Sequence, residues 1–62
     1  MKNNIATIRK QKGFSQKMFA EMVGISANWL SHIESGKRRP STRIIEKIAT
    51  NLGVSLKDIF LD

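Results

Sequence analysis

The only histidine of the chain, His32, and its only tryptophan, Trp29, lie three residues apart near the middle of the sequence. A histidine could serve as a metal ligand or a general base, but a metal site needs further ligands and a general base needs a nucleophile within reach. The chain has no cysteine and no second histidine, and Glu21 and Glu34 are spaced to point elsewhere. No glycine-rich phosphate loop is present either. These residues therefore predict no enzyme, no metal site and no cofactor.

Asn28 and His32 favour a different chemistry, because residues four apart line one stripe of a helix. An asparagine amide can form two hydrogen bonds with the N6 and N7 atoms of adenine. His32 could donate to guanine N7 or to a phosphate. The alternative is that this stripe is an ordinary solvated face.

The net charge points to a polyanionic partner. Eleven lysines and arginines oppose five acidic residues, which leaves a formal charge of +6. In a small domain this balance favours nucleic acid as the partner, and an anionic membrane surface is the main alternative. A further alternative is a basic domain whose charge serves only its solubility. A membrane partner is disfavoured, because the apolar helix faces are expected to pack against one another.

The length and composition predict one cytoplasmic domain spanning residues 1–62. A chain of this size buries only about 60% of its unfolded surface and rarely holds more than one core. It contains no apolar run suited to a secretory signal or a bilayer span. The absence of cysteine fits a reducing compartment.

Four glycines divide the chain into five segments with helical apolar spacing. Each of the first four segments is followed by a glycine at a position typical of a left-handed helix C-cap, namely Gly13, Gly24, Gly36 and Gly53. The N-cap candidates are Ser15, Ser26, Ser41 or Thr42, and Ser55. Helices are therefore predicted over residues 3–12, 16–23, 27–35, 42–52 and 56–61, and the fold class is all-α.

The second and third segments predict a helix-turn-helix over residues 16–35. A connection as short as Val23-Gly24-Ile25-Ser26 makes the two helices cross steeply. Phe19, Leu30 and Ile33 would then face a shared core. A glycine turn alone also fits an ordinary helical hairpin, but the full set of apolar and turn positions favours the helix-turn-helix.

The chain resembles the phage-repressor and Cro type of DNA-binding domain, the XRE family, over nearly its whole length. The resemblance rests on Ile8-Arg9, Phe14-Ser15-Gln16, Ala20, Val23-Gly24-Ile25-Ser26, Leu30-Ser31, Ile33-Glu34-Ser35-Gly36-Lys37, Pro40-Ser41, Ile48-Ala49, Leu52-Gly53-Val54-Ser55 and Asp58-Ile59-Phe60. It implies a compact five-helix bundle of the lambda-repressor-like type that binds operator DNA, usually as a symmetric dimer. The protein would then be bacterial or phage-encoded, cytoplasmic and associated with the nucleoid.

In this arrangement the second helix of the motif enters the major groove. Its outward residues are the predicted base contacts: Ala27, Asn28, Ser31 and His32. The predicted backbone contacts are Gln16 and Lys17 at the start of the preceding helix, Trp29, and the basic run Lys37, Arg38 and Arg39. Trp29 is expected to pack partly on the bundle and to reach a phosphate with its indole N–H.

A structural ion pair is expected between Arg9 and Glu34. Arg9 lies four residues after Ile5 and Glu34 lies four after Leu30, so packing of the two helix faces would bring the charges together. The family resemblance implies the same pair. The alternative is two solvated charges that contribute about 0–1 kcal/mol.

The predicted function is a sequence-specific regulator of double-stranded DNA, most simply a repressor on a palindromic operator. A homodimer is expected, with the apolar end Ile59, Phe60 and Leu61 as its surface; simple core packing is the alternative for these residues. The rival hypothesis is an antitoxin-like regulatory module that acts through a protein partner of unknown identity.

Overall fold

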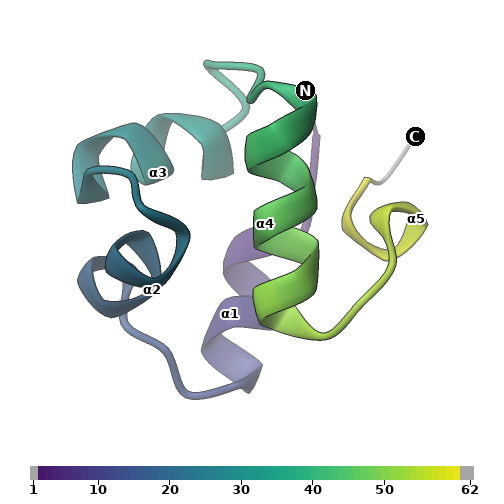
Figure 1. Cartoon of the computed structure of the whole chain (residues 1–62), viewed down its shortest axis with the longest axis horizontal. Helices are drawn as coiled ribbons and strands as arrows, with labels where there is room; N and C mark the ends of the chain where they lie inside the picture. Colours follow the sequence, from purple (N-terminus) through teal and green to yellow (C-terminus); the bar gives the residue numbers. More distant parts are fainter. Residues whose placement is uncertain (1, 61–62) are drawn as a thin grey trace.

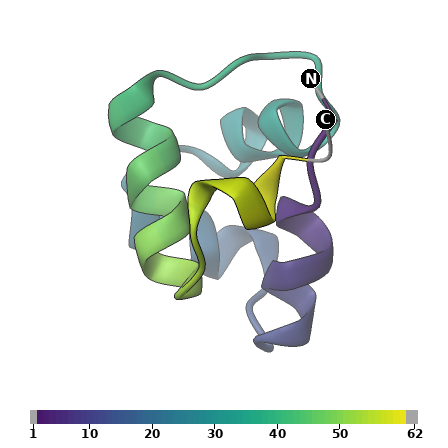
Figure 2. The same ribbon diagram turned by 90° about the vertical axis from the view of Figure 1, so that its right-hand side faces the viewer.

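The computed structural model describes residues 2–60 and confirms an all-α fold. Its five helices in that range are α1 (Ile5–Gln11), α2 (Gln16–Val23), α3 (Ala27–Glu34), α4 (Thr42–Leu52) and α5 (Leu56–Ile59). Figure 1 shows α4 in the middle, with α2 and α3 on one side of it and α5 on the other. In both Figure 1 and Figure 2, α3 lies above α2, and the segment that joins α3 to α4 runs along the top of the molecule.

Serine side chains define where three of the helices begin. A serine oxygen that accepts from a backbone N–H in the first turn satisfies one of the donors that a helix end leaves unpaired. Ser15 accepts from Met18 at 3.0 Å, Ser26 from Trp29 at 3.0 Å, and Ser41 from Ile44 at 3.2 Å. For α4 the structure thus selects Ser41 over Thr42 as the cap.

The turn between α2 and α3 depends on Gly24. Its φ of +87° lies in the left-handed region, and its N–H and that of Ile25 both donate to the carbonyl of Ala20, at 2.9 and 3.0 Å. These two bonds close the end of α2 and turn the chain into α3. The predicted helix-turn-helix connection is confirmed.

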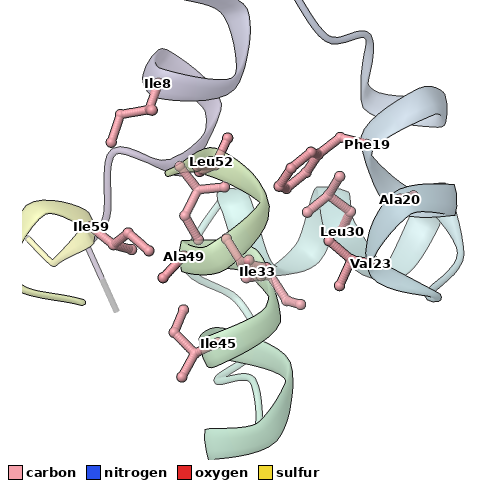
Figure 3. Packing of buried hydrophobic residues seen from close by; sticks show 12 residues of the cluster. Ile8, Phe19, Ala20, Val23, Leu30, Ile33, Ile45, Ala49, Leu52 and Ile59 are labelled. Atoms are coloured by element: carbon pink, nitrogen blue, oxygen red, sulfur yellow. The ribbon is translucent and has the colours of Figure 1, made fainter. Parts of the chain in front are cut away.

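One hydrophobic core holds the five helices together. Figure 3 shows α4 side chains between those of α2 and α3 on one side and those of α1 and α5 on the other. Phe14 stacks on Phe19 at a ring distance of 5.8 Å. The buried apolar residues are Ile5, Ile8, Phe19, Ala20, Val23, Leu30, Ile33, Ile45, Ile48, Ala49, Leu52 and Ile59.

The predicted bounds are too long for three helices. The first helix is predicted over 3–12 and the last over 56–61, whereas α1 covers 5–11 and α5 ends at Ile59. Phe60 is extended and forms an isolated antiparallel bridge with Asn3, and the N–H of Asn4 donates to the carbonyl of Ile59 at 2.9 Å. This pairing of the two ends of the chain replaces helix at both. The third helix stops one residue early, at Glu34.

Within residues 2–60, no helix has the length and apolar character that crossing a membrane requires.

Candidate nucleic-acid interface

The outer face of α3 carries small and polar side chains. Leu30 and Ile33 point inward and are fully buried, whereas Asn28 and Ser31 are exposed and His32 is half-buried. Ala27, predicted to touch a base, is half-buried and packs against the core. All four predicted base-contact residues therefore keep access to solvent on one helix, Asn28 and Ser31 more than Ala27 and His32.

Exposed basic side chains follow α3 in the chain, and another lies at the start of α2. Lys37, Arg38 and Arg39 are exposed in the segment after α3, and Lys17 is exposed in the first turn of α2. Between residues 27 and 43 the sequence holds one acid, Glu34, whose side chain is only 7% exposed. The surface formed by this stretch consequently presents cations without exposed carboxylates, which is the electrostatic pattern that attracts a phosphate backbone.

The segment after α3 folds back onto the last turn of that helix. The carbonyl of His32 accepts from the N–H groups of Lys37 and Arg38, at 3.0 and 3.2 Å, and from the hydroxyl of Ser35 at 3.1 Å. Pro40 is buried where the chain turns toward α4. The basic run is thus attached to the same helix that carries Asn28.

Trp29 connects α3 to this basic run. Its side chain is half-buried and packs against the hydrophobic core, as expected for a residue at the edge of the bundle. The guanidinium carbon of Arg38 lies over the indole ring, 5.7 Å from its centroid. This is the separation of a cation–π contact. Trp29 therefore contacts one of the predicted backbone-binding arginines.

Arg9 and Glu34 meet at the junction of α1 and α3. Arg9 Nε donates to Glu34 Oε2 at 2.7 Å and Nη2 donates to Oε1 at 3.2 Å, with side chains 6% and 7% exposed. Arg9 Nη1 also donates to the carbonyl of Phe14 at 2.8 Å. Such a paired guanidinium satisfies both charges where water is largely excluded.

Gln16 joins the same group. Its amide Nε2 donates to Glu34 Oε1 at 2.9 Å, so one of its two amide hydrogens faces inward. The expectation for Gln16 is a phosphate contact at the start of α2. Its half-buried side chain can make that contact with the hydrogen that Glu34 does not use.

The predicted dimer surface is only partly available. Ile59 is fully buried in the core of its own chain, so its assignment to an exposed surface is wrong. Phe60 is half-buried, and Leu61 lies outside the described residues. Phe60 and the exposed Leu56 border a cavity of about 200 Å³ whose other lining residues are Arg39, Pro40, Thr42 and Ile45.

No cluster of three or more histidine, cysteine or acidic side chains suited to a metal ion occurs in the described part of the chain.

Known proteins share both the sequence pattern and the fold. The family model described as helix-turn-helix matches residues 5–59. Control protein C.MunI of a Mycoplasma species is 38% identical over 61 residues, which cover 97% of this chain and 82% of that protein. The chain belongs to the helix-turn-helix family of the phage-repressor and Cro type.

The solved structures agree with this assignment. The restriction-modification controller protein C.AhdI from Aeromonas hydrophila superposes with a TM-score of 0.85 and 30% identity, over 92% of this chain and 86% of that one. SinR of Bacillus subtilis, solved in complex with DNA, matches with a TM-score of 0.79 and 36% identity, over 87% of each chain. This helix-turn-helix protein is a DNA-binding transcriptional regulator.

One relative has a different described role. Antitoxin PezA of Streptococcus pneumoniae is 43% identical over 56 residues, which cover 90% of this chain and 35% of that protein. Most of that antitoxin therefore lies outside the part similar to this helix-turn-helix chain.

Two exposed residues of this helix-turn-helix protein are absent from the site residues predicted from the sequence. Arg43 is exposed in the first turn of α4, directly after the basic run, and extends it. Its position two residues after the cap Ser41 is a signal that could have placed it there. Leu56 is 39% exposed at the start of α5. Its exposure follows from how α5 packs, which the apolar pattern alone does not specify.

Proposed function

We propose that this protein represses transcription by binding a palindromic operator as a homodimer, with α3 of each copy in the major groove. The observation that carries the proposal is the polar outer face of α3 bordered by a basic segment, with the single acid of residues 27–43 buried and paired. The similar SinR has been solved in complex with DNA, which supports DNA as the partner of this protein.

The roles of the individual side chains follow from their chemistry. Asn28 is the principal base reader, because its amide can pair with adenine through two hydrogen bonds. Ser31 and His32 make further contacts to base edges, and Ala27 borders them. Lys17, Gln16 and the run from Lys37 to Arg39 contact the phosphate backbone, which positions the helix without reading sequence. Trp29 lies against that run through its contact with Arg38.

A homodimer is part of the proposal, because one recognition helix covers only a few base pairs. A two-fold dimer doubles the site and requires two half-sites about 34–36 Å apart. Phe60 and Leu56, beside the cavity between α4 and α5, are its contact surface. The protein works in the cytoplasm of a bacterium or of a phage-infected cell, and it catalyses no reaction.

Selection of bound duplexes from a random pool tests this function. The expected result is an inverted repeat with half-sites about one helical turn apart. Asn28→Ala should change the preferred bases within each half-site. Arg39→Ala should weaken binding to all duplexes and lower the slope of log K against log salt by about 0.9. Equal losses on selected and random duplex for both variants would contradict this division of roles.

An antitoxin-like role is the second candidate, favoured by the similarity to PezA over 90% of this chain. In that case a protein partner would cover the surface at Leu56 and Phe60. Purification from the native host separates the two: a stoichiometric second protein supports the antitoxin-like role, and a homodimer that binds operator supports the repressor.

A further inference from the structure

Two arginines of this protein are held in place in opposite ways. Arg9 is 5% exposed and donates to the carboxylate of Glu34, which cancels its charge. Arg38 is exposed and lies over the indole ring of Trp29. An aromatic ring holds a guanidinium through its quadrupole and carries no net charge. Arg38 is therefore fixed with its positive charge available to a ligand, whereas Arg9 is not.

Arg38 is held to α3 through both its backbone and its side chain. Its backbone N–H donates to the carbonyl of His32 at 3.2 Å. Its guanidinium contacts Trp29, whose half-buried ring is itself packed against the core. An arginine that is ordered before binding avoids the entropy cost of immobilising a long side chain when the complex forms.

The cation–π contact leaves the N–H donors of Arg38 available to a ligand. A guanidinium is planar, and its N–H groups point outward in that plane, while the ring occupies only one face. Two N–H groups on one edge match the spacing of two oxygens on a phosphate. The same side chain can therefore remain on the indole and donate to a phosphodiester.

We propose that Trp29 is a positioning residue that holds Arg38 as a preordered, fully charged clamp for one DNA phosphate beside the major groove. This inference rests on the proposed function. It adds that the residues of the basic run, Lys37 to Arg39, contribute to DNA binding in different ways. Arg38 is the ordered member, because among these three residues only its side chain lies over an aromatic ring in the described structure, and Lys37 and Arg39 supply charge. Trp29 then contributes to affinity through Arg38.

A double-mutant cycle between Trp29 and Arg38 tests this coupling on a random-sequence duplex. We expect Trp29→Leu to weaken binding about fivefold. In a protein that already carries Arg38→Ala, the same substitution should change affinity less than twofold. The matched control is a protein that carries Arg39→Ala. In that protein Trp29→Leu should still weaken duplex binding about fivefold. Trp29→Phe retains an aromatic face and should restore most of the wild-type affinity.

Two measurements separate positioning from general damage to the fold. Circular dichroism identifies conditions in which every variant is folded, and binding is compared only there. Arg38→Lys leaves the core untouched and keeps the charge, so the salt slope should stay at the wild-type value while affinity falls about fivefold, because an ammonium lacks the planar face that stacks. This variant carries the test if Trp29→Leu does not fold.

Specific outcomes would overturn the inference. An undiminished effect of Trp29→Leu in the Arg38→Ala protein, or an Arg38→Lys protein that binds as tightly as wild type, would show that the stack does not prepare the clamp. A wild-type protein that binds no duplex at low salt would instead overturn the proposed function, and this inference with it. The two failures are therefore distinguishable.

Discussion

Glu34 is the carboxylate that joins the first three helices. It accepts from Arg9 on α1 and from Gln16 on α2, and Arg9 in turn donates to the loop carbonyl of Phe14. The acid itself belongs to α3, so one buried group links the first three helices. The pairing also buries the only acidic side chain of residues 27–43, the segment that forms the proposed DNA site. Fold and electrostatics therefore depend on the same side chain.

Glu34→Ala is expected to destabilise the protein by about 3–5 kcal/mol, because it leaves the buried guanidinium of Arg9 without a partner. For a domain of this size the loss approaches the whole free energy of unfolding. Urea unfolding followed by circular dichroism measures it. Glu46→Ala removes an exposed acid from α4 and is the matched control, expected to change stability by less than about 0.5 kcal/mol. A Glu34→Ala protein as stable as the control would show that the pair contributes little.

At the scale of the elements, the turn at Gly24 sets how α3 is presented. A Cβ built on this glycine would meet no atom within 4 Å, so space does not restrict the position, and the positive φ does. Gly24→Ala should therefore cost about 1–2 kcal/mol of stability through backbone strain alone. Gly24→Asn should cost less, because asparagine tolerates the left-handed region. Thermal unfolding of the two variants compares them, and an alanine protein as stable as the asparagine one would contradict this account.

Local signals account for most of the helix bounds, and contacts between distant residues account for the differences. Apolar spacing and serine caps predict α2 and α4 at the bounds that the structure has. They cannot predict that Phe60 pairs with Asn3, since no periodicity records a bridge between the two ends of a chain. In the proposed DNA site, too, local sequence signals do not predict contacts made through a loop. Helical spacing identifies the outer residues of α3, but the cation–π contact of Arg38 with Trp29 depends on how the following loop folds.

The short helix α5 depends on the cap between Ser55 and Asp58. The hydroxyl and the backbone N–H of Ser55 both donate to Asp58 Oδ2, at 2.8 and 3.0 Å. These bonds favour the ionised carboxylate and lower the pKa of Asp58 below its ordinary value. A lowered pKa in the folded state means that the cap contributes stability above the ordinary pKa of about 3.9 and loses it as the pH falls through the folded-state pKa.

Urea midpoints measured between about pH 6 and pH 2 test this cap, over a range that brackets the ordinary carboxyl pKa. We expect the urea midpoint of the wild-type protein to decrease as Asp58 is protonated. The decrease should be smaller for Asp58→Asn. Parallel profiles for wild type and Asp58→Asn would mean that this carboxylate does not contribute to the acid sensitivity of the fold.

At the scale of the whole molecule, three large apolar side chains are exposed in the described residues, and they lie on two different elements. Met18 and Met22 are 48% and 41% exposed on α2, and Leu56 is 39% exposed on α5. Leu56 alone of the three borders the cavity beside α4, together with Phe60. The proposed dimer therefore assigns a function to Leu56 and leaves the two methionines outside the contact.

Leu56→Lys is expected to separate the dimer without unfolding either copy, because the side chain is already partly in water. Binding to a full palindrome should then weaken roughly 100-fold, since the second half-site loses the high effective concentration that linkage provides. Binding to a single half-site should stay as it was. Met22→Lys adds the same charge at a similarly exposed residue and should leave the dimer intact. Sedimentation equilibrium and binding to full and half operators measure both effects, and a wild-type protein that stays monomeric at high concentration would refute the dimer.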